Sequence, residues 1–200
     1  KNYFNEKNLV KSKKLSAVVT TGPTREYIDP VRYISNESSG KQGYEVALAL
    51  KKLGIKTRLI AGPSNYISSK DLKIINITSA KEMMNEVKKS LPVDIAVCAA
   101  AVSDFKPISK SKNKIKKNDK NFSKISLEKN ADILDFLSKN NQARPKIVVG
   151  FSAETENVIQ NSKLKIKQKY CDLIIANDVS KKDVGFNSDY NKVSIIDKKG

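Results

Sequence analysis

Short apolar runs alternate with helical patterns along most of the chain. Runs rich in β-branched residues and bounded by turn formers predict strands at residues 15–21, 56–62, 73–78, 93–101, 146–153 and 171–177, and in the VSIID segment near the C-terminal end. Several runs are apolar at successive positions, a pattern typical of strands that are covered on both faces. We therefore expect a mostly parallel sheet enclosed by helices.

Helical periodicity fills the intervals between these strands. It predicts helices at residues 40–54, 79–91, 130–140 and 156–169. Ser79 followed by Glu82 forms a capping box at the start of the second helix, and Gly54 is placed to end the first. Strand and helix alternate, so we expect an α/β fold: a Rossmann-like, doubly wound sheet with helices on both faces. Ligands should bind beyond the carboxyl ends of the strands.

Two stretches interrupt this alternation of strands and helices. Residues 103–129 are lysine-rich and too polar for a core helix, so we expect a flap or hairpin there. Residues 1–14 are basic and lack the apolar segment of a secretory signal, so we expect a linker or tail. Residues 15–200 should then form a single domain.

The first strand-to-helix connection, residues 20–43, is long and rich in turn formers. It lacks the G-x-G-x-x-G spacing of dinucleotide-binding folds, which disfavours a nicotinamide-dependent oxidoreductase. Its end, SSGKQG, offers hydroxyls and glycine amides at a helix start, where phosphate binds well, although an ordinary serine-capped helix fits too. Lys41 does not complete a Walker P-loop.

Several side chains after the first and fourth strands are candidates for chemistry. Arg32 suits a carboxylate or phosphate and Asn36 suits an oxyanion, but each equally suits loop stabilisation. Asp104 follows a strand, where it could serve a polar ligand or cap a turn. The lysines of KIKK, residues 114–117, form either a solvated charge run or a cover for a triphosphate.

Composition narrows the function classes. The chain has 200 residues, a net charge of +17 and no histidine, which excludes hydrolases with a histidine base and makes a zinc site unlikely to form. All but four of the 38 basic residues are lysines spread along the chain, which indicates a solvated lysine coat more than a nucleic-acid-binding surface. Such a coat also steers polyanionic substrates.

The same sequence also indicates the cellular compartment and the environment of the two cysteines. The sequence has no apolar run long enough to cross a bilayer, and we expect a cytoplasmic protein with no membrane partner. Cys98 and Cys171 lie within apolar runs, and we expect both to be buried core residues.

A set of ordered motifs carries a resemblance to a known family. VVTTGPTREYIDPVRYISNESSGKQG, AAAVSDFKP, KIKK, KN-x-DIL, VVGFSAET and DLIIANDVS, in this order, resemble the bacterial phosphopantothenoylcysteine synthetases over residues 15–197. The resemblance implies a ligase that activates 4′-phosphopantothenate with CTP and Mg²⁺ or Mn²⁺ to an acyl-cytidylate. Cysteine then displaces CMP and yields 4′-phosphopantothenoylcysteine for coenzyme A biosynthesis.

The resemblance also implies roles for individual residues. Asn36 would handle the acyl-cytidylate, and Lys114 of the flap would serve its formation. Arg32, Ala100 and Ala101 would line the pantothenate pocket. The nucleotide-binding positions would be Gly22, Ser38, Gly40, Gly43, Asp104, Lys114, Ala131, Asp132, Ile133, Phe151, Lys165, Lys169 and Asn177. The metal would be held mainly by the nucleotide phosphates.

The resemblance also concerns subunit contacts and fused domains, and two other functions stay open as alternatives. The family dimerises, its flap can reach across the subunit interface, and many bacterial members carry an N-terminal flavin-dependent decarboxylase; this segment should bind no flavin. The chain departs from the family by having Ala131 where proline is common and by extra lysines around Lys114. Eukaryotic relatives use ATP, and CTP is preferred here on the bacterial-type motifs. The alternatives are a Rossmann-like NAD(P) oxidoreductase and a basic nucleic-acid-binding domain.

Overall fold

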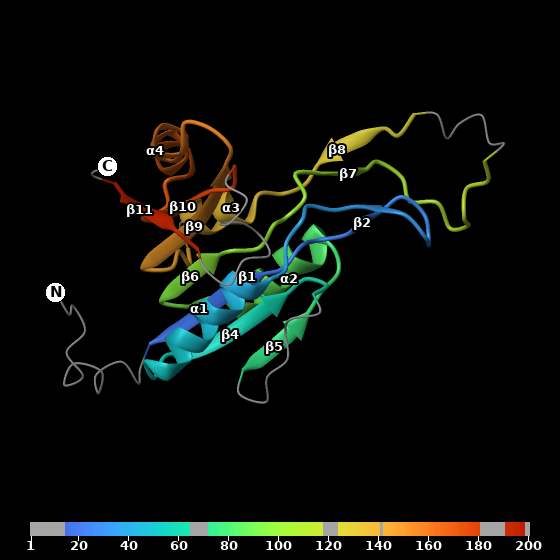
Figure 1. Ribbon diagram of the computed structural model, residues 1–200. Coiled ribbons are helices and arrows are strands. Elements are labelled where there is room, and N and C mark those ends of the chain that lie inside the picture. Colours follow the sequence, from blue (N-terminus) through green and yellow to red (C-terminus); the bar gives the residue numbers. More distant parts are fainter. Residues whose placement is uncertain (1–14, 65–71, 118–123, 141, 181–190, 199–200) are drawn as a thin grey trace.

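The chain folds around one twisted sheet (Figure 1). The computed structural model describes residues 15–64, 72–117, 124–140, 142–180 and 191–198. The sheet order is β11-β10-β9-β6-β1-β4-β5, and every neighbouring pair is parallel except β10 with β11. The strands are β1 (Ser16–Thr21), β4 (Lys56–Ala61), β5 (Lys73–Asn76), β6 (Ile95–Cys98), β9 (Ile147–Glu154), β10 (Leu173–Asp178) and β11 (Val193–Asp197).

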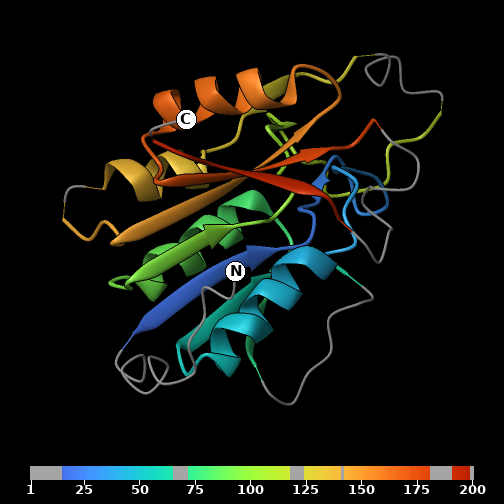
Figure 2. The same cartoon turned by 60° about the vertical axis from the view of Figure 1, so that its left-hand side comes forward.

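Helices cover both faces of this sheet, which confirms the expected fold class. They are α1 (Lys41–Lys52), α2 (Ala80–Ser90), α3 (Ile133–Lys139) and α4 (Val158–Lys169). Figure 2 shows α1 in front of the sheet and α2 and α3 behind it. Each predicted strand and helix has its counterpart, displaced by a few residues at the ends.

The core has one layer on each side of the sheet because successive strand residues face opposite ways. Val18 of β1 packs in the larger cluster with residues of α2, α3 and α4, and its neighbour Val19 packs in the smaller cluster beneath α1. The α1 side holds Leu59, Tyr44 and Ala47. Each large side chain buried here contributes about 1.5–3 kcal/mol through the hydrophobic effect, so these two layers fix the strand ends that carry the site.

The helix ends follow the sequence signals. Ser79 caps α2 by accepting a hydrogen bond from the Glu82 amide at 3.3 Å. The Glu82 carboxylate accepts from the Thr78 amide at 2.8 Å, one residue earlier than in a standard capping box. Gly54 follows α1 with φ of 79°, a conformation that glycine adopts without strain.

A polar cluster joins the amino ends of the central strands. Asp94, just before β6, accepts hydrogen bonds from the Ser16 amide at 2.8 Å and the Ser16 hydroxyl at 3.0 Å, and it pairs with Lys146 at 2.8 Å. These donors, Lys146 foremost, lower the pKa of Asp94 to about 2. The ionised carboxylate therefore ties β1, β6 and β9 together at the edge opposite the site.

The chain reverses its direction across the sheet between β1 and β6. From β1 it passes through α1 to β4 and β5 on one side, and from β6 it passes through α3 to β9 and β10 on the other. In open α/β sheets the crevice beyond the carboxyl ends at such a reversal is the usual ligand site. The residues after Thr21 and Cys98 are therefore where a site should lie.

Two small hairpins form an arm that projects from this edge (Figure 1). One hairpin is β2 (Glu26–Tyr27) with β3 (Tyr33–Ile34), inside the long first connection, and the sequence pattern did not predict it. The other is β7 (Phe105–Pro107) with β8 (Leu127–Lys129), within residues 103–129, the flap. Within the described ranges, no helix is long and apolar enough to span a membrane.

Candidate functional site

Two adjoining cavities occupy the carboxyl edge of the sheet at the β1–β6 reversal. The first, the α3 cavity, has a volume of about 540 Å³ and lies between the end of β6, the start of α3 and α4. The second, the α1 cavity, has a volume of about 960 Å³ and lies between the start of α1, the loop after β6 and the ends of β9 and β10. Both are lined by Ala100, Val102, Asp104, Phe151 and Lys165. These shared walls make the two cavities neighbouring compartments.

The start of α1 opens into the α1 cavity. Gly40, the N-cap residue, has φ of 77° and no side chain to cap the helix, and the first turn has no acidic residue. The Thr21 hydroxyl donates to the Gly40 carbonyl at 2.6 Å, which docks the helix start on the end of β1. Gly43 allows this approach, because a Cβ there would lie 2.5 Å from Thr21 Oγ1. The positive end of the helix dipole at this wall of the cavity suits an anion.

Serine and asparagine side chains order the segment that enters α1. The Ser38 hydroxyl accepts from the Gly40 amide at 3.2 Å. Asn36 Nδ2 donates to the Val102 carbonyl at 3.0 Å, which links this segment to the loop after β6. Asn36, Ala100 and Ala101 thereby line the same cavity. The resemblance implies contacts with the acyl substrate for these three residues and for Arg32.

The backbone brings Gly22 against the same loop. The Ala101 amide donates to the Gly22 carbonyl at 3.0 Å, and φ of Gly22 is 73°. A Cβ at Gly22 would lie 3.0 Å from the Gly62 carbonyl oxygen, so only glycine fits without strain. Gly22 itself lines neither cavity, and within the described residues it shapes the loop that does.

Charged residues of α3 and α4 line the α3 cavity. Asp132 caps α3 by accepting from the Asp135 amide at 2.8 Å and pairs with Lys169 at 2.7 Å. Desolvation opposes ionisation of Asp132, but the Asp135 amide and Lys169 outweigh it and lower its pKa. Its partner Lys169 has a raised pKa, chiefly through the hydrogen bond to Asp132. Lys165 donates to the Phe151 carbonyl at 3.1 Å, at the wall between the cavities.

Asn177, in β10, brings an unused acceptor to the α1 cavity. Its Oδ1 atom is buried and accepts no hydrogen bond from the part of the chain that the structure describes. A buried acceptor left unsatisfied costs about 1–3 kcal/mol. A hydroxyl or amine of a ligand in this cavity would supply the missing donor.

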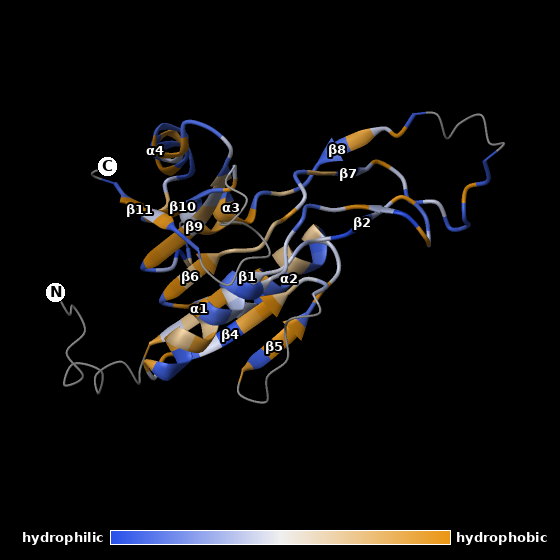
Figure 3. Ribbon diagram, in the orientation of Figure 1, coloured by the Kyte–Doolittle hydropathy of each residue, from blue (hydrophilic) through white to orange (hydrophobic). Residues whose placement is uncertain are grey.

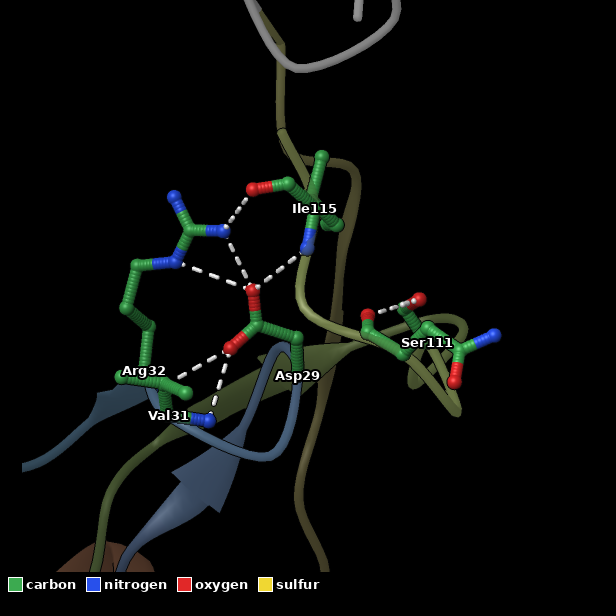
Figure 4. Close-up of polar contacts among 6 residues, drawn as sticks. Asp29, Val31, Arg32, Ser111 and Ile115 are labelled. Atoms are coloured by element: carbon green, nitrogen blue, oxygen red, sulfur yellow. Dashed lines mark hydrogen bonds and ion pairs between the residues drawn. The ribbon is translucent and has the colours of Figure 1, made fainter. Parts of the chain in front are cut away.

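Arg32 and Lys114 do not line either cavity. The Arg32 guanidinium pairs with Asp29 and donates to the Ile115 carbonyl at 2.8 Å, on the arm (Figure 4). Lys114 is exposed beside Ile115 in the flap. Apart from Gly22, the other predicted positions all line a cavity, namely Asn36, Ser38, Gly40, Gly43, Ala100, Ala101, Asp104, Ala131, Asp132, Ile133, Phe151, Lys165, Lys169 and Asn177.

Some residues of the site escaped the sequence analysis. Cys98, expected in the core, ends β6 and lines the α3 cavity, where burial raises the pKa of its thiol to about 12 and keeps it neutral. Cys171 is buried as expected but precedes β10. Asn130 holds the loop after β6 through a bond from Nδ2 to the Ser103 carbonyl at 2.9 Å. Asn130 lies between the exposed strand β8 and α3, and its place in the KN-x-DIL motif was the available signal for it.

The chain offers few ligands for a metal ion. Within the described residues, no group of three or more histidine, cysteine, aspartate or glutamate side chains lies close enough to hold one. Asp104 is the carboxylate that lines both cavities. This arrangement fits a divalent cation that arrives with phosphate oxygens and keeps several waters, as Mg²⁺ does.

Comparisons with known proteins agree with the geometry. A family model described as the DNA/pantothenate metabolism flavoprotein C-terminal domain matches residues 12–200. A curated relative from Borreliella burgdorferi, the coenzyme A biosynthesis bifunctional protein CoaBC, is 43% identical over 199 residues, which cover 98% of this chain and 49% of that protein. The chain therefore spans about half the length of that relative.

Two solved structures share the fold. The crystal structure of the C-terminal domain of a CoaBC protein matches with a TM-score of 0.76 and 31% identity, covering 94% of this chain and 83% of that one. A Cab2 mutant in complex with phosphopantothenate-cysteine matches with a TM-score of 0.69 and 17% identity, covering 97% of this chain and 80% of that one. At 17% identity, the similarity to the Cab2 mutant shows a shared fold alone.

Proposed function

The chain belongs to the family of DNA/pantothenate metabolism flavoprotein C-terminal domains, and on this premise we propose that it is a phosphopantothenate–cysteine ligase of coenzyme A biosynthesis. The relative matched over 49% of its length is a coenzyme A biosynthesis bifunctional protein, and one fold neighbour was solved with phosphopantothenate-cysteine. The observation that carries the proposal is the pair of adjoining cavities, because a ligase must hold a nucleotide and an acid in contact.

The shared wall gives each substrate a compartment. We assign the nucleoside of CTP to the α3 cavity, among Ala131, Asp132 and Ile133, and its phosphates to the passage beside Lys165. The start of α1 offers amides to phosphate oxygens in the α1 cavity. Lys165 lines both compartments and so suits the point where the two substrates meet.

The proposed reaction has two steps, transfer of a cytidylyl group and then transfer of an acyl group. A carboxylate oxygen of 4′-phosphopantothenate attacks the α-phosphorus of CTP, and the bond to pyrophosphate breaks, giving the acyl-cytidylate. The amine of cysteine then attacks the acyl carbon, CMP leaves with the electron pair of the broken bond, and the amine loses a proton. Neither transfer needs a histidine base, which accords with a histidine-free chain.

Asn36 and Lys114 are assigned to different steps. Asn36, held by Val102 at the edge of the α1 cavity, can donate to the oxygen that gains charge when cysteine attacks. Lys114 carries a positive charge on an exposed segment, which suits the charge that grows on departing pyrophosphate. Arg32 is assigned to the pantothenate substrate, to which it brings a guanidinium already ordered by Asp29.

Mg²⁺, or Mn²⁺, would enter with CTP and neutralise its phosphates. Asp104 is the side chain placed to contact the hydrated ion, because it faces both cavities. The residues around it bind and orient the substrates. We propose that the reaction uses no flavin.

We further propose a cytoplasmic homodimer in which the arm forms the subunit contact. The arm exposes several large apolar side chains, and Figure 3 shows β8 hydrophobic at one end and hydrophilic at the other. Exposed apolar side chains on a projecting element suit burial against a second copy. These side chains are Val31, Tyr33, Phe105, Ile108, Ile125 and Leu127. A dimer would also bring the flap near the partner's cavities.

The test is product formation by the purified chain. The protein is incubated with Mg²⁺, 4′-phosphopantothenate, cysteine and either CTP or ATP, and pyrophosphate and the cysteine adduct are measured. We expect both products, a preference for CTP, and a mass of twice the chain by light scattering. An Asn36→Asp variant should release pyrophosphate but accumulate the acyl-cytidylate.

The outcomes separate the parts of the proposal. Products with ATP alone would keep the ligase and overturn the choice of CTP. A folded wild-type protein that binds CTP but releases no pyrophosphate would overturn the ligase. Products from a monomer would overturn the role of the arm.

A further inference from the structure

Asp29 is a fully buried carboxylate on the arm, outside both cavities. Its relative exposure is 0%, and it sits in the turn between β2 and β3. Its Oδ1 atom accepts from the Val31 amide at 2.8 Å and the Arg32 amide at 2.9 Å. These bonds use one carboxylate oxygen to build the turn, as aspartate does before proline.

The second oxygen of Asp29 reaches into the flap (Figure 4). Oδ2 accepts from Arg32 Nε at 2.9 Å and from the Ile115 amide at 3.2 Å. Arg32 Nη2 also contacts Oδ2, and it donates to the Ile115 carbonyl at 2.8 Å. We call this set of contacts between Asp29, Arg32 and Ile115 the Asp29 bridge. It holds both the N–H and the C=O of a single flap residue.

A further backbone bond supports the bridge. The Ser111 amide donates to the Ile28 carbonyl at 2.9 Å, so the flap is tied to the turn at two points on either side of Lys114. The Arg32 guanidinium holds the pKa of the Asp29 carboxyl well below its usual range, so the carboxylate stays ionised. A buried charge with this many donors orders its surroundings more than it stabilises the fold.

We propose that Asp29 is a positioning residue for Lys114: by holding Ile115, its carboxylate fixes the backbone on which the adjacent flap lysine stands. The same carboxylate orients Arg32, so one buried group sets two side chains assigned to the substrates. The inference rests on the proposed function for the role of Lys114. The contacts of the Asp29 bridge can be measured independently of that function.

The Asp29→Asn variant cuts the bridge selectively. An amide oxygen placed at Oδ1 keeps the Val31 and Arg32 amide bonds of the turn. The amide nitrogen then stands at Oδ2, where it faces the donors of Arg32 and Ile115 and can accept from neither. Asp94→Asn is the matched control, because Asp94 is also an ion-paired carboxylate but lies at the opposite edge of the sheet.

The first readout is independent of activity. In the wild-type protein, the Ile115 amide should exchange hydrogen at least tenfold more slowly than an unprotected amide. In Asp29→Asn, tryptic cleavage after Lys114 should rise at least tenfold relative to cleavage elsewhere in the chain, and Asp94→Asn should leave this ratio unchanged. A freely exchanging Ile115 amide, or an unchanged cleavage ratio in Asp29→Asn, overturns the bridge.

The second readout is kinetic. For Asp29→Asn we expect kcat for pyrophosphate release to fall about a hundredfold, as when a catalytic group is misplaced by about 1 Å, with the KM for CTP changed less than threefold because the cavities are intact. A normal kcat in a variant with an opened flap overturns the positioning role. An inactive wild type with a protected Ile115 amide overturns the proposed function and the role of Lys114, while the bridge stands.

Discussion

Replacing Gly43 with alanine tests how closely α1 must approach the sheet. The added Cβ would lie 2.5 Å from Thr21 Oγ1, 2.6 Å from Thr21 Cβ and 3.1 Å from the Thr20 carbonyl oxygen. Thr21 is fully buried and its hydroxyl holds the Gly40 carbonyl, so it cannot rotate away without losing that bond. The helix start must therefore move outward by several tenths of an ångström or more.

The expected loss of stability in Gly43→Ala is the difference between two opposing effects. Overpacking of this kind costs about 1–3 kcal/mol, and alanine recovers up to about 1 kcal/mol of helix propensity relative to glycine. We expect a net loss of about 1–2 kcal/mol, which lowers Tm by about 2–8 °C for a domain of this size. Because Gly40 moves with the helix, the Kd for CTP should also rise about tenfold.

Calorimetry and a CTP titration measure the two effects separately. A Tm equal to that of the wild type would refute the packing argument. A lowered Tm with unchanged CTP affinity would refute the placement of phosphates at the start of α1. The double variant that adds Thr21→Gly removes the clashing side chain and should recover part of the lost affinity.

Three further predictions address the cavity walls and the opposite edge. Lys165→Met removes a charge that faces both cavities, and CTP affinity by calorimetry should fall about tenfold with the urea midpoint unchanged; unaltered affinity would exclude Lys165 from the site. Asn177→Ala deletes a buried acceptor that has no partner among the described residues, so nucleotide affinity should fall about fivefold while Tm stays level or rises; a fall in Tm would contradict this assignment. Asp94→Asn should weaken urea resistance at neutral pH, and because the folded pKa is lowered to about 2 from 3.8, the deficit should shrink as the pH falls from about 4 toward 2. A deficit that is constant over this range would mean that the Asp94 charge contributes nothing.

Periodicity along the chain predicted the sheet and helices well because each element is long enough to show its period. The apolar run at β1 and the capping signal at Ser79 depend only on near neighbours. The β2–β3 hairpin escaped prediction because its strands have two residues each, too few for any alternation to appear.

Placement of the site was partly predictable for a similar reason. Gly40 and Gly43 lie at a predicted helix start, so the phosphate-binding role that we propose for them could be suggested from local sequence. The meeting of Asn36 with Val102 spans 66 residues, and that of Asp29 with Ile115 spans 86 residues. Contacts at such separations depend on the whole fold, so composition and spacing could not pair them. Cys98 was misplaced because an apolar run does not reveal that its last residue faces a cavity.

In the proposed reaction, the adjoining cavities join CTP to the carboxylate of 4′-phosphopantothenate before cysteine takes part. Exchange of labelled pyrophosphate into CTP tests it most directly, with Mg²⁺ present and cysteine absent. We expect exchange that requires phosphopantothenate and falls sharply in Asp29→Asn. Exchange without phosphopantothenate, or exchange that appears only when cysteine is added, would contradict it.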